Sequence, residues 1–334
     1  MNKKIKKLRI TFLAILLFVT IMILSTSTYA WFTSNRVVTV NTINVHVAAS
    51  GGLEISTDGQ DWKSIIQPDD ITGVHNTTYP NSVNQIPYEL KPVSTGKEID
   101  NSTGFLKMFY GEATNNTDGD YVLMSQRSVE KEGNGVESDG LFVAFDLFLK
   151  VTGEQDIYLS NKSQVTYAGE KNTGIVNATR VAFIDEGTLP DGTDLRQIQA
   201  LKSGINSTTY IWEPNYDVHT PASVQNAYNT YGIATTTTNA QRIIYDGVIS
   251  EIPSMDEILL QKANSTYYPN LFKTVKVDYY TKENFVDYQK VFTLKSGITK
   301  IRVYMWIEGQ DIDCENNASF GDVEFNVQFT VNPA

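Results

Sequence analysis

The end of the chain alternates apolar and polar residues with a period of two, and this pattern constrains the fold more than any other feature. Between residues 321 and 331 the apolar positions are Val323, Phe325, Val327, Phe329 and Val331. Because successive side chains of a strand point to opposite faces, the pattern predicts a strand with one buried and one solvated face. A helix would need apolar residues three or four positions apart.

Segments of the same kind recur along the chain, separated by Gly, Asn and Asp turns. They are residues 105–110, 141–151, 156–159, 163–167, 179–184, 272–280, 288–294 and 299–307. Residues 141–151 alternate most strongly and predict a central strand covered on at least one side. Many short strands and few helices predict an all-β fold, an antiparallel jelly-roll-like β-sandwich with long loop insertions and at most one or two short helices.

The first strand contains a slip in its alternation. Residues 38–42 alternate in one phase, whereas residues 43–47 alternate in the opposite phase. A slip of one residue predicts a β-bulge, because the extra residue returns the apolar set to the buried face. Gly51 and Gly52 then end this strand.

Two segments break the strand pattern. Residues 67–104 are dense in Pro, Asn, Asp, Ser and Thr, which predicts a long surface loop. Residues 186–270 have loose spacing, and we interpret them as an insertion that decorates one β-sandwich domain of residues 31–334. Residues 254–263 are the best helix candidate, because Ser254 is a favourable N-cap and Glu257 completes a capping box.

The N-terminus has the composition of an export signal. A basic tip leads into an apolar run at residues 10–24, and Ala30 is the small residue that a signal peptidase needs before the cut. The run is shorter than the roughly 20 residues that span a bilayer, which favours cleavage between Ala30 and Trp31. The alternative is an uncleaved membrane helix over residues 10–32, extended by interfacial aromatics. Residues 1–30 are thus a signal peptide or a membrane anchor, with the remainder at the cell surface or outside the cell.

Composition excludes some partners. The chain has 38 acidic and 27 basic residues, and a net charge of −11 disfavours binding to nucleic acid or anionic lipid. Cys314 is the only cysteine, so no disulfide forms within the chain. Stability must therefore come from burial and strand pairing.

No sequence motif specifies a reaction. The chain lacks an HExxH or HxH metal motif, a GxSxG nucleophile elbow and a Gly-rich phosphate loop. Its three histidines, His46, His75 and His219, lie far apart in the sequence. An acidic pair for glycoside hydrolysis has no local signature among so many carboxylates. We therefore predict no enzyme activity and no resident cofactor.

One acidic segment is a weak candidate for calcium binding. Glu308, Asp311 and Asp313 follow a predicted strand, and their carboxylates are the hard oxygen ligands that calcium prefers. The spacing does not match an EF-hand loop. The alternative is an acidic, solvated turn without a metal.

The start of the chain resembles a family of exported proteins. Ala30, Trp31, Phe32 and Thr33 run directly into a long strand rich in Val, Thr and Asn. In this respect residues 1–50 are similar to the TasA and camelysin proteins of Gram-positive bacteria, which carry a SipW-type signal peptide. The resemblance implies processing by a dedicated signal peptidase and a jelly-roll subunit that assembles into biofilm-matrix fibres.

In such fibres the N-terminal strand of one subunit completes the sheet of the next. Physical chemistry allows this here, because a strand freed by cleavage, at residues 33–47, is a ready donor for an open sheet edge. The chain departs from the family pattern at the loop of residues 67–104 and at the insertion of residues 186–270.

We therefore predict an exported, non-enzymatic structural protein of the cell surface or extracellular matrix, with copies of itself as the main partner. The first alternative is a module that binds cell wall or carbohydrate by stacking sugars on loop aromatics. The candidate aromatics are Trp62, Tyr79, Tyr88, Trp212 and Tyr216. The least favoured alternative is a secreted hydrolase.

Overall fold

The computed structural model describes the chain from residue 40 to residue 331, with gaps. The described ranges are 40–130, 140–168, 174–215, 218–225, 245–253, 258–259, 262–279, 289–314 and 321–331. The predicted export segment, its cleavage site at Ala30 and Trp31 and the helix of residues 10–32 all lie outside these ranges. Among the described residues, no helix has the length and apolar character needed to cross a membrane.

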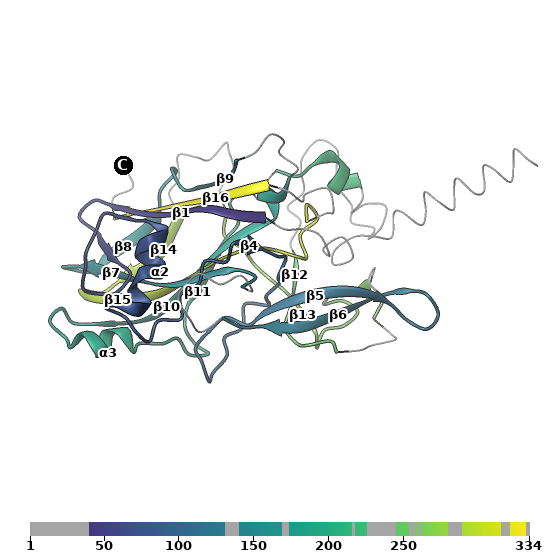
Figure 1. The fold of residues 1–334 in the computed structure, drawn as a ribbon, viewed down its shortest axis with the longest axis horizontal. Helices are drawn as coiled ribbons and strands as arrows, with labels where there is room; N and C mark the ends of the chain where they lie inside the picture. The colour runs from purple at the N-terminus through teal and green to yellow at the C-terminus, as the bar shows by residue number, and fades with distance from the viewer. Residues whose placement is uncertain are drawn as a thin grey trace, which may run out of the picture.

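Two β-sheets dominate the described chain (Figure 1). Sheet A has seven strands: β1 (Val40–Ser50), β3 (Ile65–Ile66), β4 (Glu89–Leu90), β8 (Gln155–Leu159), β9 (Gln164–Ala168), β14 (Gln289–Leu294) and β16 (Gly321–Thr330). Sheet B has five strands: β2 (Glu54–Ser56), β7 (Val143–Val151), β10 (Thr179–Leu189), β11 (Thr209–Trp212) and β15 (Gly297–Ile307). The predicted all-β architecture is confirmed.

The remaining elements are short. A hairpin of β5 (Met108–Asn115) and β6 (Tyr121–Ser128) lies toward one end of the molecule, and β12 (Asp246–Val248) pairs with β13 (Phe272–Thr274) (Figure 1). The described helices include α2 (Pro68–Thr72), α3 (Leu195–Gln199) and the 3-10 turns η2 (Gly73–Asn76) and η3 (Ile175–Ala178), and residues 221–225 are also helical. Helices are thus few and short in the described residues, as expected of an all-β fold.

The two sheets pack face to face around one large core. Phe183 of β10 in sheet B contacts Phe329 of β16 in sheet A, with ring centroids 5.2 Å apart. Apolar residues at alternate positions of both sheets fill the space between them. In β16, Val323, Phe325 and Val327 are buried while the residues between them are half-buried, which confirms the predicted alternation.

Strand β1 lies inside sheet A, next to β16. The two strands pair along their length, from Val40 opposite Gly321 to Ser50 opposite Thr330, with a register shift between Thr42 and Asn44. This shift confirms the predicted bulge. The pairing is parallel, so the prediction of a purely antiparallel sandwich was wrong at this position. A parallel pair is possible because the whole domain separates the first strand from the last one in sequence.

The outer face of sheet B is also buried. Apolar side chains of β7, β10, β11 and β15 form a second core with residues from two connecting segments, 93–108 and 245–277. This arrangement explains why the burial of β7 is nearly continuous rather than alternating.

The prediction of a surface loop at residues 67–104 was therefore wrong. Much of this segment is buried, and its polar side chains satisfy main-chain groups there. Gln85 donates from Nε2 to the carbonyl of Phe142 at 2.8 Å, and Asn84 donates from Nδ2 to the carbonyl of Ile71 at 3.1 Å. Polar composition failed as a sign of exposure because these amides replace water as hydrogen-bonding partners.

The predicted helix at residues 254–263 is not supported where the structure describes it. Leu259 forms a β-bridge with Val122, and the amide of Leu123 donates to the carbonyl of Ile258 at 3.2 Å. Ser254 and Glu257 lie outside the described residues. Ile258 is fully buried against the β5–β6 hairpin, so tertiary packing outweighs the local capping signal.

Candidate functional site

Alternate residues of β15 carry polar groups to the outer face of sheet B. Ile301, Val303, Met305 and Ile307 enter the core between the sheets, whereas Lys300 and Arg302 lie on the opposite face. Both cations are almost fully buried. Two cations within a mainly apolar strand are the sequence feature that could have indicated this site. The sequence pattern was interpreted only as a strand.

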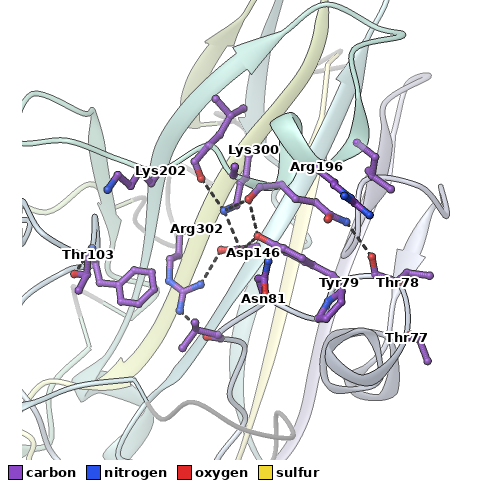
Figure 2. A pocket seen from close by; sticks show the side chains of 17 residues that line it. Thr77, Thr78, Tyr79, Asn81, Thr103, Asp146, Arg196, Lys202, Lys300 and Arg302 are labelled. Carbon is purple, nitrogen blue, oxygen red and sulfur yellow. Dashed lines mark hydrogen bonds and ion pairs between the residues drawn. The ribbon is translucent and has the colours of Figure 1, made fainter.

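A cavity of about 700 Å³ lies at this end of β15 (Figure 2). Its base is formed by Asp146 of β7 together with Lys300 and Arg302. Its walls come from α3 with the loop that follows it, from the loop at residues 77–83, and from Thr103 and Phe105. The site thus combines five separate segments of the chain.

The base of the cavity is a closed network of ion pairs and hydrogen bonds. Arg302 donates from Nη1 to Asp146 Oδ1 at 2.7 Å and from Nη2 to the carbonyl of Val83 at 2.7 Å. Lys300 Nζ lies 3.1 Å from Asp146 Oδ2 and 2.9 Å from Glu186 Oε2. The hydroxyl of Tyr79 lies 2.8 Å from Asp146 Oδ2. Both oxygens of Asp146 are therefore occupied by partners.

Electrostatics keep Asp146 and Lys300 in their charged forms. Burial alone would raise the pKa of Asp146, but Lys300 and Arg302 outweigh it and lower the pKa to about 2. Burial acts against the charge of Lys300, yet Asp146 and Glu186 raise its pKa overall. The pKa of Glu186 shifts in the opposite direction to that of Asp146, because burial and the neighbouring Asp146 raise it to about 7. The charges at the base of the cavity are thus paired with one another inside the protein.

The cations at the rim of the cavity are exposed and unpaired among the described residues, unlike those at its base. Arg196 and Lys202 are exposed, and neither side chain forms a hydrogen bond or ion pair with another described residue. The side chain of Asn81 is also exposed in the cavity lining, and its amide forms no hydrogen bond with another described residue. The lining contains a single carboxylate, Asp146, so it does not supply the two carboxyl groups that glycoside hydrolysis uses.

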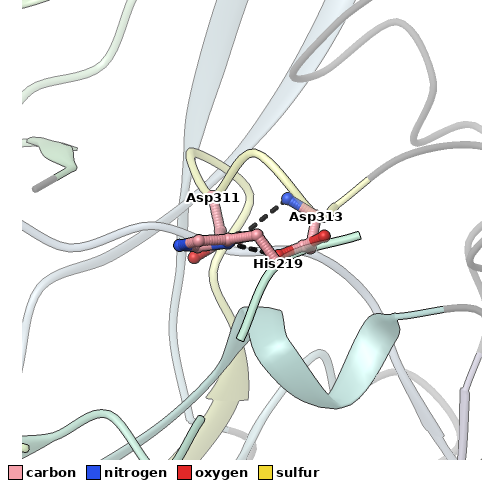
Figure 3. A group of neighbouring side chains, drawn as sticks. All are labelled: His219, Asp311 and Asp313. Atoms are coloured by element: carbon pink, nitrogen blue, oxygen red, sulfur yellow. Dashed lines mark hydrogen bonds and ion pairs between the residues drawn. The ribbon is translucent and has the colours of Figure 1, made fainter. Parts of the chain in front are cut away.

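A second polar group lies on the turn after β15 (Figure 3). Asp311, Asp313 and His219 place ligand-type atoms within 4.8 Å of one another. His219 donates from Nδ1 to Asp313 Oδ2 at 2.6 Å, and the amide of Thr220 donates to Asp313 Oδ1 at 2.9 Å. Burial lowers the pKa of His219, but its hydrogen bond to Asp313 and the nearby carboxylates raise it overall.

The positive charge beside Asp311 comes from Arg180. Its guanidinium Nη2 lies 2.5 Å from Asp311 Oδ2 and 2.6 Å from Glu213 Oε1, with all three side chains buried. Burial, together with repulsion from Asp311, raises the pKa of Glu213 to about 8, while Arg180 opposes this rise. These ion pairs connect β10 to the residue that follows β11 and to the turn after β15.

The expected calcium ligands are only partly brought together. Asp311 and Asp313 are adjacent, but the third member of the group is His219, which sequence reasoning did not connect to them. Glu308 instead accepts from Trp306 Nε1 at 3.0 Å and from the amide of Gln310 at 3.0 Å. Burial raises the pKa of Glu308 to about 7. A turn that is this buried is not the solvated acidic turn of the alternative interpretation.

The loop aromatics proposed for sugar stacking occupy different environments. Trp212 is fully buried in the core, and Tyr79 is buried at the base of the cavity. Trp62 is half-buried with Lys150 over its ring, whereas Tyr88 is 64% exposed. Tyr216 lies outside the described residues. The four described aromatics therefore do not provide a common stacking surface.

No family model, curated protein or solved structure matches this chain.

Proposed function

We propose that the protein is an exported, non-enzymatic structural subunit of the cell surface or extracellular matrix, and that copies assemble into fibres by exchanging strand β1. The observation that carries the proposal is the position of β1. It is the first strand of the described chain, and it pairs with the last strand over Val40–Ser50. A jelly-roll arrangement of the strands and an export signal at residues 1–30 are parts of the same proposal.

The contacts of β1 make it suitable for exchange. One edge of β1 has ten residue pairs with β16, whereas its other edge has two residue pairs with β3 and two with β4. If β1 of one copy enters the sheet of the next, each hydrogen bond to β16 forms again between chains. Exchange of an identical element is a low-cost route to assembly, because the interface already exists in the closed monomer.

The connection after β1 can act as the hinge. Gly51 and Gly52 follow the strand directly and have φ angles of 76° and 89°, a region that glycine adopts without strain. Both residues are exposed, and a side-chain carbon built on Gly52 would meet no atom within 4 Å. The hinge can therefore change direction without disturbing the core. Residues 33–39, which complete the expected donor strand, lie outside the described residues.

Electron microscopy of the purified full-length chain tests the proposal. We expect fibres whose formation depends on protein concentration. A variant that lacks residues 40–50 should form none, and a synthetic peptide of residues 40–50 should bind it and raise its melting temperature. A scrambled peptide of the same composition is the matched control. Fibres formed by the deletion variant would rule out β1 as the donor.

The alternatives predict different results. A wall-binding module would sediment with purified cell wall and remain monomeric at high concentration. A secreted hydrolase would turn over glycan or peptide substrates.

A further inference from the structure

The cavity at the outer face of sheet B concentrates positive charge in an acidic protein. Its lining contains Arg196, Lys202, Lys300 and Arg302 against the single carboxylate of Asp146. The chain as a whole has a net charge of −11. A concave site lined by one sign of charge focuses the electrostatic field and attracts ions of the opposite sign.

The charge available to a ligand is at the rim. Lys300 and Arg302 are already neutralised by Asp146, Glu186 and Glu130, which lie between 2.7 and 3.8 Å from them. Arg196 and Lys202 are not neutralised in this way by the described residues, and Figure 2 shows them on either side of Lys300. An anionic group at either side of the rim would gain a charge-assisted contact without breaking an existing ion pair.

The neutral groups of the lining indicate what else the ligand carries. The Asn81 amide and the Thr103 hydroxyl offer hydrogen bonds, and the Phe105 ring offers an apolar face, with Arg302 stacked 4.2 Å from its centroid. A ligand with several hydroxyl groups and an apolar ring face matches this mixture. The volume of about 700 Å³ lies within the usual range of small-molecule sites.

We propose that this cavity binds an acidic saccharide, with its carboxylate or phosphate held at the rim by Arg196 or by Lys202. The base of Asp146, Lys300 and Arg302 keeps the cavity open and gives the site its shape. This binding site goes beyond the assembly function and does not depend on the exchange of β1, since none of the lining residues belongs to β1 or β16.

Isothermal titration calorimetry of the full-length chain tests the proposal, in a polyoxyethylene detergent that carries no sugar. The probes are glucuronate, glucose 6-phosphate, glucose and inorganic phosphate. We expect glucuronate or glucose 6-phosphate to bind, and glucose and inorganic phosphate to bind at least about tenfold more weakly, because each lacks one half of the recognised chemistry. The acidic probe that binds shows whether the site recognises a carboxylate or a phosphate.

Variants at the rim separate specific binding from general attraction. Whichever of Arg196 and Lys202 holds the anionic group, its substitution by Gln should weaken binding of the acidic probe roughly tenfold to hundredfold, the effect of losing one charge-assisted contact. Lys162→Gln and Lys273→Gln remove exposed cations outside the lining and should leave the affinity unchanged. The melting temperature of each variant shows that it is folded.

Three results would overturn the proposal. They are the absence of binding by both acidic probes, equal affinities for glucuronate and glucose, and equal losses of affinity in the rim variants and the controls. Failure of fibre formation, by contrast, would leave these affinities as they are, so the two proposals can fail separately.

Discussion

Replacing Asp146 by Asn tests the account of the cavity base. The substitution keeps the shape of the side chain and one acceptor oxygen, but it removes the negative charge between Lys300 and Arg302. In the wild type Asp146 is buried and lies 2.7 Å from Arg302 Nη1 and 3.1 Å from Lys300 Nζ. Asp146→Asn should therefore leave two buried cations short of a counter-charge.

The size of the effect follows from two estimates. Lowering the pKa of Asp146 from 3.8 to about 2 corresponds to about 2 kcal/mol of favourable interaction. Removing one partner of a buried ion pair costs about 3–5 kcal/mol, because the other charge stays buried. We expect Asp146→Asn to lower the free energy of unfolding at neutral pH by between about 2 and 5 kcal/mol.

Urea denaturation at a series of pH values measures this effect. Because the folded-state pKa of Asp146 is depressed, its contribution is fully present above pH 3.8 and is lost as the pH falls from 3.8 toward about 2. The difference between wild type and variant should therefore shrink over that window.

The matched control is Asp156→Asn, which breaks an exposed pair with Lys290 and should have a much smaller effect. A loss below about 1 kcal/mol for Asp146→Asn, or a loss that does not vary with pH, would refute the reasoning. In the double variant with Lys300→Met, the total loss should be less than the sum of the single losses, because both charges of the pair are removed together.

Three further predictions concern other parts of the fold. Gly297→Ala should destabilise the protein by more than about 2 kcal/mol in urea denaturation, because φ is 130° and the new carbon would overlap the Leu189 carbonyl. The stabilising effect of His219, measured against His219→Gln, should be full below pH 6.5 and decline as the pH rises through its raised pKa; a difference that grows with pH would contradict this. Calcium should leave the melting temperature unchanged, because Arg180 already neutralises Asp311; a rise with calcium concentration would show binding to the folded state.

The strands were the part of the fold that the sequence predicted well. The alternation at residues 321–331 indicated β16 and its buried face, because a period of two places all the apolar side chains on one face of a strand. The phase slip in the first strand located the bulge that the register places between Thr42 and Asn44. Both signals are local, so each is readable from a few neighbouring residues.

Partners distant in sequence could not be predicted in the same way. No local pattern records that β1 runs parallel to β16, since that depends on the path of the whole chain. The burial of residues 67–104 was missed because polar side chains such as Gln85 find main-chain partners inside the protein. The cations of the cavity base are buried for the same reason, with Asp146 supplied by another strand.

The candidate sites show this limit most clearly. Asp311 and Asp313 were selected from their spacing, but the residues that complete their environment are His219 and Arg180, about 90 or more positions away in the chain. Their grouping depends on the tertiary fold. Glu308, although closer in sequence, faces Trp306 and takes no part in that group.

The most direct test of strand exchange is a disulfide trap between β1 and β16. Ala48 and Gln328 are paired residues of these strands, and both can be replaced by Cys in a Cys314→Ser background. If β1 is exchanged, oxidation of assembled fibres should link neighbouring chains into a ladder of covalent oligomers on a gel without reductant. A Cys pair at Thr166 and Glu324, between β9 and β16, should give cross-linked monomers only. Monomers alone from the Ala48–Gln328 pair in assembled fibres would contradict the account.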